Sequence, residues 1–178
     1  MEIVLIRHTP TAAPEGTCYG HLDVPLADGF ASAIAATLTK VPRTDAIFSS
    51  PLQRCAILAE ALAKRDASQV LFAAELRELN FGAWEGQPWS QVPRTLSDPW
   101  AEDPWSRAPP GGETEQALWQ RVETWRQQAL AGRTGRVAVV AHGGSLRALR
   151  CLLLGMNRRQ GWSWRIGYGA VEVLESSG

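Results

Sequence analysis

The sequence predicts an α/β fold in which helices cover a mainly parallel sheet. Two short apolar runs, 3–6 and 137–141, are rich in β-branched residues and lack the alternation of a half-exposed strand. Strand-like and helix-like segments alternate along the chain, which is typical of this class. A length of 178 residues suits one domain with a sizeable core. We therefore expect a single domain over residues 1–178, built as a three-layer α/β/α sandwich.

Each predicted element rests on a local pattern. Strands are expected where short apolar runs are rich in β-branched or aromatic residues. The helix at about 52–65 follows Pro51, a residue that favours the first turn of a helix. In the helix at about 114–131, Leu118, Val122 and Trp125 recur at helical spacing. In chain order we expect a strand at 3–6, a helix at 29–40, a strand at 46–48, the helix at 52–65, a strand at 70–72, the helix at 114–131, a strand at 137–141, a helix at 145–154 and a strand at 170–174.

A segment rich in proline and tryptophan interrupts this alternation at about 83–112. Repeated proline disfavours long regular elements, because proline lacks an N–H and restricts the residue before it. Irregular chain of this length inside a compact domain is typical of a lid or a binding loop. We therefore expect a lid-like insertion here, whose indoles either stack on an aromatic ligand or pack together under the loop. Its tryptophans are Trp84, Trp89, Trp100 and Trp105.

Composition excludes several classes of partner. The formal net charge is zero, with 18 basic and 18 acidic residues, which argues against a broad cationic face for nucleic acid or for an anionic membrane. All basic residues except Lys40 and Lys64 are arginine, an excess that codon bias alone would explain. No apolar run is long enough for a signal peptide or a membrane span, so we expect a soluble, cytoplasmic protein. The three cysteines form no CxxC pair, which argues against a disulfide framework or a thiolate zinc site.

Two of the three histidines directly follow the buried strands. His8 comes after the strand at 3–6 and His142 after the strand at 137–141. Ligands of open α/β sheets bind at the carboxyl ends of the strands, so both imidazoles are expected at one edge. Arg7 and Arg54 lie at strand ends too, and Gly143-Gly144 leads into a helix whose N-terminal N–H groups suit an anion. Guanidinium groups bind phosphate oxygens in pairs, so this set predicts a site for a phosphate ester.

Five stretches, taken in order, also resemble the histidine phosphatase superfamily, which includes the cofactor-dependent phosphoglycerate mutases. They are Leu5-Ile6-Arg7-His8-Thr9, Tyr19-Gly20-His21-Leu22-Asp23, Ser49-Ser50-Pro51-Leu52-Gln53-Arg54, Leu76 to Gly86 and Ala141-His142-Gly143-Gly144. The Phe-Gly-Ala-Trp-Glu-Gly stretch, Pro110 to Thr114 and the short length are most similar to the α-ribazole phosphatases of cobalamin biosynthesis. The resemblance implies a phosphoglycerate mutase-like fold.

The resemblance also implies roles for particular residues. His8 matches the nucleophile that forms a phosphohistidine, Glu78 matches the general acid and base, and Arg7, Arg54 and His142 match the groups that bind phosphoryl oxygens. No metal or other cofactor is expected. Thr9 departs from the family, which usually has glycine there, and its Cβ would narrow the approach to the backbone. Gly143 and Gly144 are expected to bind the phosphate. Further candidates for contact with the substrate are Thr9, Tyr19, Gly20, His21 and Trp84.

The expected function is hydrolysis of a small phosphomonoester, α-ribazole 5′-phosphate above all. A broad-specificity or sugar-phosphate phosphatase of the same family is the alternative, and an inactive module that binds phosphorylated ligands is the alternative of another class. A mutase is disfavoured, because the family's mutases carry insertions for which this chain has no room. The basic and indole-rich segment at 158–164 either faces a second copy, as in a homodimer, or covers the core.

Overall fold

The computed structural model describes residues 1–175 and confirms the α/β class. Its five-stranded sheet has the order β3-β2-β4-β1-β5, and only β5 runs antiparallel to its neighbour, β1. The strands agree with the predicted ones to within about two residues at each end. They are β1 (Glu2–Arg7), β2 (Ala46–Ser49), β3 (Val70–Phe72), β4 (Arg136–Ala141) and β5 (Val171–Glu175).

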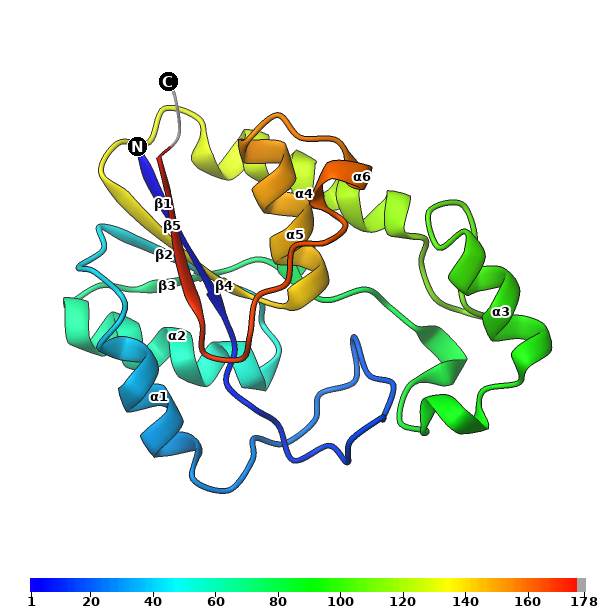
Figure 1. Cartoon of the computed structure of the whole chain (residues 1–178). Coiled ribbons are helices and arrows are strands. Elements are labelled where there is room, and N and C mark those ends of the chain that lie inside the picture. Colours follow the sequence, from blue (N-terminus) through cyan, green and yellow to red (C-terminus); the bar gives the residue numbers. More distant parts are fainter. Residues whose placement is uncertain (176–178) are drawn as a thin grey trace.

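Helices cover both faces of the sheet (Figure 1). One face packs against α1 (Phe30–Leu38) and α2 (Gln53–Asp66), and the other against α4 (Glu115–Leu130) and α5 (Gly143–Leu153). The four predicted helices are thus confirmed. Two more were not predicted: α3 (Arg94–Glu102) and the short α6 (Arg158–Gly161). None of the helices within residues 1–175 is long and apolar enough to cross a membrane.

The central strands are buried on both faces, as their unbroken apolar runs predict. In β1, Ile3 and Leu5 join the core under α4 and α5, whereas Val4 and Ile6 join the core under α1 and α2. Alternate side chains of a strand point to opposite faces, so one run supplies both cores. All four are 0% exposed, and complete burial of one such side chain stabilises a fold by about 1.5–3 kcal/mol.

The carboxyl ends of the four parallel strands and the start of β5 lie at one edge of the sheet. Arg7 pairs with Ala141, and Ser49 pairs with Val140, so the carboxyl ends of β1, β2 and β4 lie side by side. Strand β5 starts at this same edge because it is antiparallel, with Val171 opposite Ile6. The residues that follow β1, β2 and β4 and those that precede β5 therefore meet there.

The proline-rich and tryptophan-rich segment is more regular than its prolines predict. It contains two 3₁₀ turns, Gly82–Trp84 and Trp89–Gln91, and the nine-residue helix α3. Pro88 and Pro93 directly precede the second turn and α3, where a missing N–H removes no helical hydrogen bond, whereas Pro99 lies inside α3. Its tryptophans form two separate groups. Trp84, Trp89 and Trp100 cluster with Phe81, while Trp105 packs against Trp119 of α4.

Candidate active site

His8 presents one unprotonated ring nitrogen at the end of β1. Its Nδ1 lies 2.7 Å from the carbonyl oxygen of Thr9. A carbonyl only accepts, so Nδ1–H must be the donor and Nε2 keeps its lone pair. Burial, aided by the positive charges of Arg54 and Arg7, lowers the pKa of His8 to about 3. The imidazole is therefore neutral at neutral pH, with Nε2 available as a nucleophile.

His142 lies beside His8 with both of its ring nitrogens in hydrogen bonds. The two rings are 5.1 Å apart at their centres. The Nε–H of Arg54 donates to Nδ1 of His142 (3.3 Å), so the proton must lie on Nε2, which donates to the Ser50 hydroxyl (2.9 Å). Burial, together with the positive charges nearby, lowers the pKa of His142 well below its usual range. The two imidazoles are thus both neutral, and the positive charge of the site comes from arginine.

Arg54 is completely buried at the start of α2, and loop carbonyls fix its guanidinium. Besides its bond to His142, it donates to the carbonyl oxygens of Leu22 (2.9 Å) and Gly20 (2.6 Å). The backbone of Gly20 packs so closely against Leu79 that no side chain fits: a Cβ on Gly20 would lie 1.7 Å from the carbonyl oxygen of Leu79. A guanidinium has more N–H groups than these three bonds use, so Arg54 still has donors for an anion.

Arg7, the second arginine of the site, directly precedes His8. Its NH1 donates to the carbonyl oxygen of Ile166 (2.7 Å), and its guanidinium carbon lies 3.9 Å from the centre of the Tyr168 ring. Its Nε is buried and has no hydrogen-bond partner among residues 1–175. An unpaired buried donor is costly, and in this place a phosphoryl oxygen would satisfy it.

Glu78 lies at the N-terminus of α5. Its Oε2 accepts from the backbone N–H of Gly144 (2.9 Å), and its Oε1 accepts from the N–H of Leu79 (2.9 Å). Arg121 of α4 holds the Glu78 backbone through its carbonyl oxygen (2.9 Å). A carboxylate is stabilised at the positive end of a helix, so the N–H of Gly144 expected for phosphate is here bonded to Glu78.

A family model described as "Histidine phosphatase superfamily (branch 1)" matches residues 3–178. The chain belongs to this superfamily. As a histidine phosphatase it is a phosphoric monoester hydrolase, which confirms the class expected from its five stretches of sequence. The phosphoglycerate mutase-like fold implied by those stretches is confirmed as well.

Known phosphatases resemble the chain over most of its length. The crystal structure of the α-ribazole phosphatase from Shigella flexneri has a TM-score of 0.88 and 27% identity, and the match covers 98% of this chain and 90% of that one. Glucosyl-3-phosphoglycerate phosphatase of Mycolicibacterium vanbaalenii is 34% identical, with 86% and 74% covered. Phosphoserine phosphatase 1 of Hydrogenobacter thermophilus is 27% identical, with 98% and 86% covered.

The other residues of this phosphatase that were predicted to contact the substrate differ in how deeply they are buried. Thr9 is fully buried next to His8, and its hydroxyl has no hydrogen-bond partner among residues 1–175. The hydroxyl of Tyr19 bonds to that of Tyr168 (3.1 Å), and its ring lies 5.2 Å from the Arg54 guanidinium. Nε2 of His21 is 3.8 Å from the carboxylate of Glu113, whereas Trp84 is buried against Cys18 and Val92.

Glu85, a nearby carboxylate in the same stretch of sequence, has a different role from Glu78. The carboxylate of Glu85 accepts from the backbone N–H groups of His21, Leu22 and Phe81. It therefore ties two loops together, while Glu78 faces the edge of the sheet where His8 and His142 lie.

Two residues of the phosphatase site, Ser50 and Tyr168, were not predicted from the sequence. Ser50 directly follows β2, so the strand-end rule that found His8 and His142 applies to it as well. Tyr168, whose ring is 5.4 Å from that of His8, precedes β5. Finding it would have required knowing that β5 runs antiparallel.

Burial of two neutral histidines predicts that acid destabilises the phosphatase. Below the ordinary pKa of 6.5 the unfolded chain binds protons that folded His8, with its pKa of about 3, does not bind. Unfolding is therefore favoured as the pH falls. Between pH 7.5 and 5.5 each buried histidine should lower the free energy of unfolding by about 1.4 kcal/mol. Urea unfolding at both pH values measures this change, and a His8→Gln variant should lose about 1.4 kcal/mol of the pH dependence. An unaltered pH dependence in that variant would contradict the prediction.

Proposed function

We propose that the chain hydrolyses a small-molecule phosphomonoester through a phosphohistidine on His8, with α-ribazole 5′-phosphate as its substrate. The observation that carries the proposal is the free Nε2 of the buried, neutral His8, whose pKa is lowered by burial and by the nearby positive charges of Arg54 and Arg7. Two guanidiniums beside a neutral nucleophile suit phosphoryl transfer, which depends on positioning and on neutralising the equatorial oxygens.

In the first step Nε2 of His8 attacks phosphorus and the bond from phosphorus to the ester oxygen breaks. Glu78 enters this step in its protonated form, not as a carboxylate, and gives its proton to the leaving oxygen, which departs as an alcohol. In the second step Glu78, now a carboxylate, takes a proton from water while the water oxygen attacks phosphorus. The nitrogen–phosphorus bond breaks, inorganic phosphate leaves, and His8 and Glu78 return to their starting states.

Arg7, Arg54 and His142 would hold the transferred group between these steps. The unpaired Nε–H of Arg7 and the unused N–H groups of Arg54 can donate hydrogen bonds to the phosphoryl oxygens. His142 would share its Nε2–H between the Ser50 hydroxyl and one oxygen. Gly143 would take part through its backbone at the start of α5.

The choice of α-ribazole 5′-phosphate is supported by the likeness to the Shigella enzyme over nearly the whole chain. The relatives named for phosphoserine and for glucosyl-3-phosphoglycerate support a broad-specificity or sugar-phosphate phosphatase instead. We expect kcat/KM for α-ribazole 5′-phosphate to exceed that for phosphoserine, glucosyl-3-phosphoglycerate and p-nitrophenyl phosphate by about tenfold or more. Equal efficiency on all four esters would contradict a role in cobalamin biosynthesis and leave the phosphatase activity intact. With 3-phosphoglycerate, release of phosphate without 2-phosphoglycerate would exclude a mutase.

A further inference from the structure

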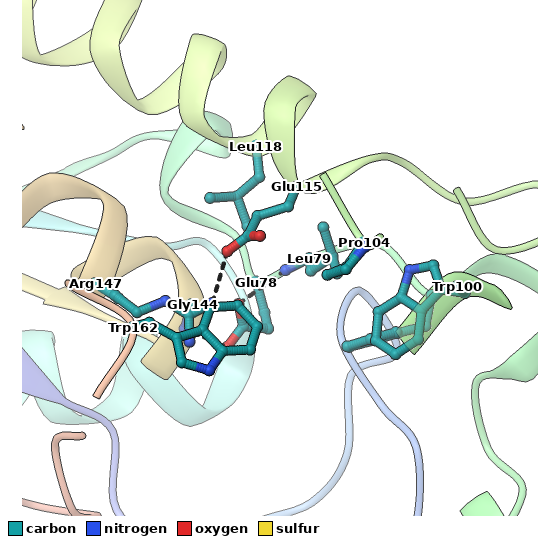
Figure 2. Close-up of a pocket in the computed structure, with 10 residues that line it drawn as sticks. Glu78, Leu79, Trp100, Pro104, Glu115, Leu118, Gly144, Arg147 and Trp162 are labelled. Carbon is teal, nitrogen blue, oxygen red and sulfur yellow. Dashed lines mark hydrogen bonds and ion pairs between the residues drawn. The ribbon is translucent and has the colours of Figure 1, made fainter. Parts of the chain in front are cut away.

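A cavity of about 290 Å³ opens directly beside Glu78 and Gly144 (Figure 2). Its size lies at the lower end of the range for small-molecule sites, about 300–1,000 Å³, so it has room for one ring system. Because Glu78 forms part of its wall, a group inside it would be attached to the oxygen that Glu78 protonates. Its apolar lining includes Leu79, Phe81, Pro104 and Leu118.

Two indoles from distant parts of the chain also line this cavity. Trp100 belongs to α3, and Trp162 directly follows α6. In Figure 2 they stand on either side, with Glu78 and Leu79 between them. Indole faces pack well against flat rings and gain from offset or edge-to-face contact. The walls of the cavity thus favour a flat aromatic occupant.

A buried ion pair fixes the wall that carries Trp162. Arg147 of α5 donates to the carboxylate of Glu115 (2.8 Å), which is only 4% exposed. The Arg147 guanidinium in turn lies 5.3 Å from the centre of the Trp162 ring, within range of a cation–π contact. Trp162 is therefore held beside the cavity although it is 46% exposed. Packing of the core does not require an indole in that position.

Trp100, for its part, is held by the aromatic cluster of the proline-rich segment. Its ring stacks on Trp89 at 5.8 Å and meets Trp84 edge-to-face at 5.5 Å. The cluster thus contributes Trp100 and Phe81 to the cavity wall, whereas Trp84 and Trp89 are not among the residues that line it.

We propose that this cavity holds the alcohol part of the substrate, and that Trp162 and Trp100 select phosphate esters whose alcohol carries a flat aromatic ring. The inference rests on the proposed phosphatase activity at His8 and adds the class of leaving group to it. It also assigns a function to the segment at 158–164. From the sequence, the indoles of this segment were expected either to face a second copy of the chain or to cover the core.

Two simple esters test this selectivity, 2-phenylethyl phosphate and ethyl phosphate, which release similar primary alcohols with and without a ring. In the unaltered enzyme kcat/KM for the phenylethyl ester should be higher by about tenfold or more. Trp162→Leu should reduce this ratio to about two, by a loss on the phenylethyl ester alone, while Trp162→Phe should retain most of it. The product 2-phenylethanol should also inhibit Trp162→Leu more weakly than the unaltered enzyme.

Trp164→Leu is the matched control. Trp164 lies the same 5.3 Å from an arginine, Arg150, but it does not line the cavity, so the ratio should stay unchanged. An equal loss on both esters in Trp162→Leu, or no loss on either, would overturn the inference. Failure to release phosphate from either ester would contradict the proposed function itself. A retained ratio with poor hydrolysis of α-ribazole 5′-phosphate would instead contradict only the named substrate.

Discussion

Replacing His8 with alanine is expected to lower phosphate release from every ester by about 10⁴-fold or more. The substitution removes the free Nε2 to which the phosphoryl group would be transferred. No other unprotonated ring nitrogen within residues 1–175 is free at this edge, because Nδ1 of His142 accepts from Arg54 and its Nε2 donates to Ser50. Steady-state release of phosphate measures the loss. Brief exposure of the unaltered enzyme to labelled substrate should also leave an acid-labile, base-stable label, which His8→Ala should lack.

Two controls separate chemistry from folding in this variant. His8→Ala should keep the circular dichroism spectrum of the unaltered enzyme, and it should still bind inorganic phosphate, because Arg7 and Arg54 remain. EDTA should not change the activity of the unaltered enzyme. Hydrolysis that survives at more than a few per cent in His8→Ala would contradict the covalent mechanism. If the unaltered protein binds phosphate but hydrolyses no ester, the phospholigand-binding alternative would be favoured.

The sheet was predictable because burial on both faces leaves a strong mark on sequence. The runs that became β1 and β4 are apolar at every position, since their alternate side chains enter two different cores. The strand-end rule then placed His8 and His142 at one edge without knowledge of the strand order. Helix α3 was not predictable in this way, because the prolines of this segment suggested irregular chain. Pro93 only precedes the helix, but Pro99 lies inside it.

The rest of the site depends on tertiary contacts that no local pattern records. Tyr168 reaches Arg7 because β5 reverses direction, and Trp162 reaches the cavity beside Glu78 because Arg147 and Glu115 hold it there. The charge of the site could not be read from residue types either. Two histidines and two arginines suggest four positive groups, whereas burial keeps both imidazoles neutral and leaves the charge to Arg7 and Arg54. A protein with zero net charge thus holds a cationic site through two guanidiniums.

The glycine at position 144 should matter more for catalysis than for folding. A Cβ built there would lie 2.2 Å from Oε1 of Glu78 and 3.2 Å from its carboxyl carbon, so alanine must displace the carboxylate. Alanine nevertheless favours a helix over glycine by about 1 kcal/mol, and Gly144 lies in the first turn of α5. We therefore expect Gly144→Ala to leave thermal stability unchanged or raised while kcat on an alkyl phosphate falls by about 10²-fold, the scale of general acid catalysis.

The choice of ester shows whether this loss comes from Glu78. The leaving group of p-nitrophenyl phosphate is a stable phenolate that departs without a proton, so Gly144→Ala should retain much more activity on it than on ethyl phosphate. Gly143→Ala is the matched comparison, because its Cβ would lie 3.7 Å from the nearest atom of Arg7, an ordinary contact, and it carries the same change in helix propensity. Its loss should be smaller by about tenfold on ethyl phosphate. If Gly144→Ala slows both esters equally, Gly144 does not act by positioning Glu78, and its backbone would then belong to the phosphate site that the sequence predicted.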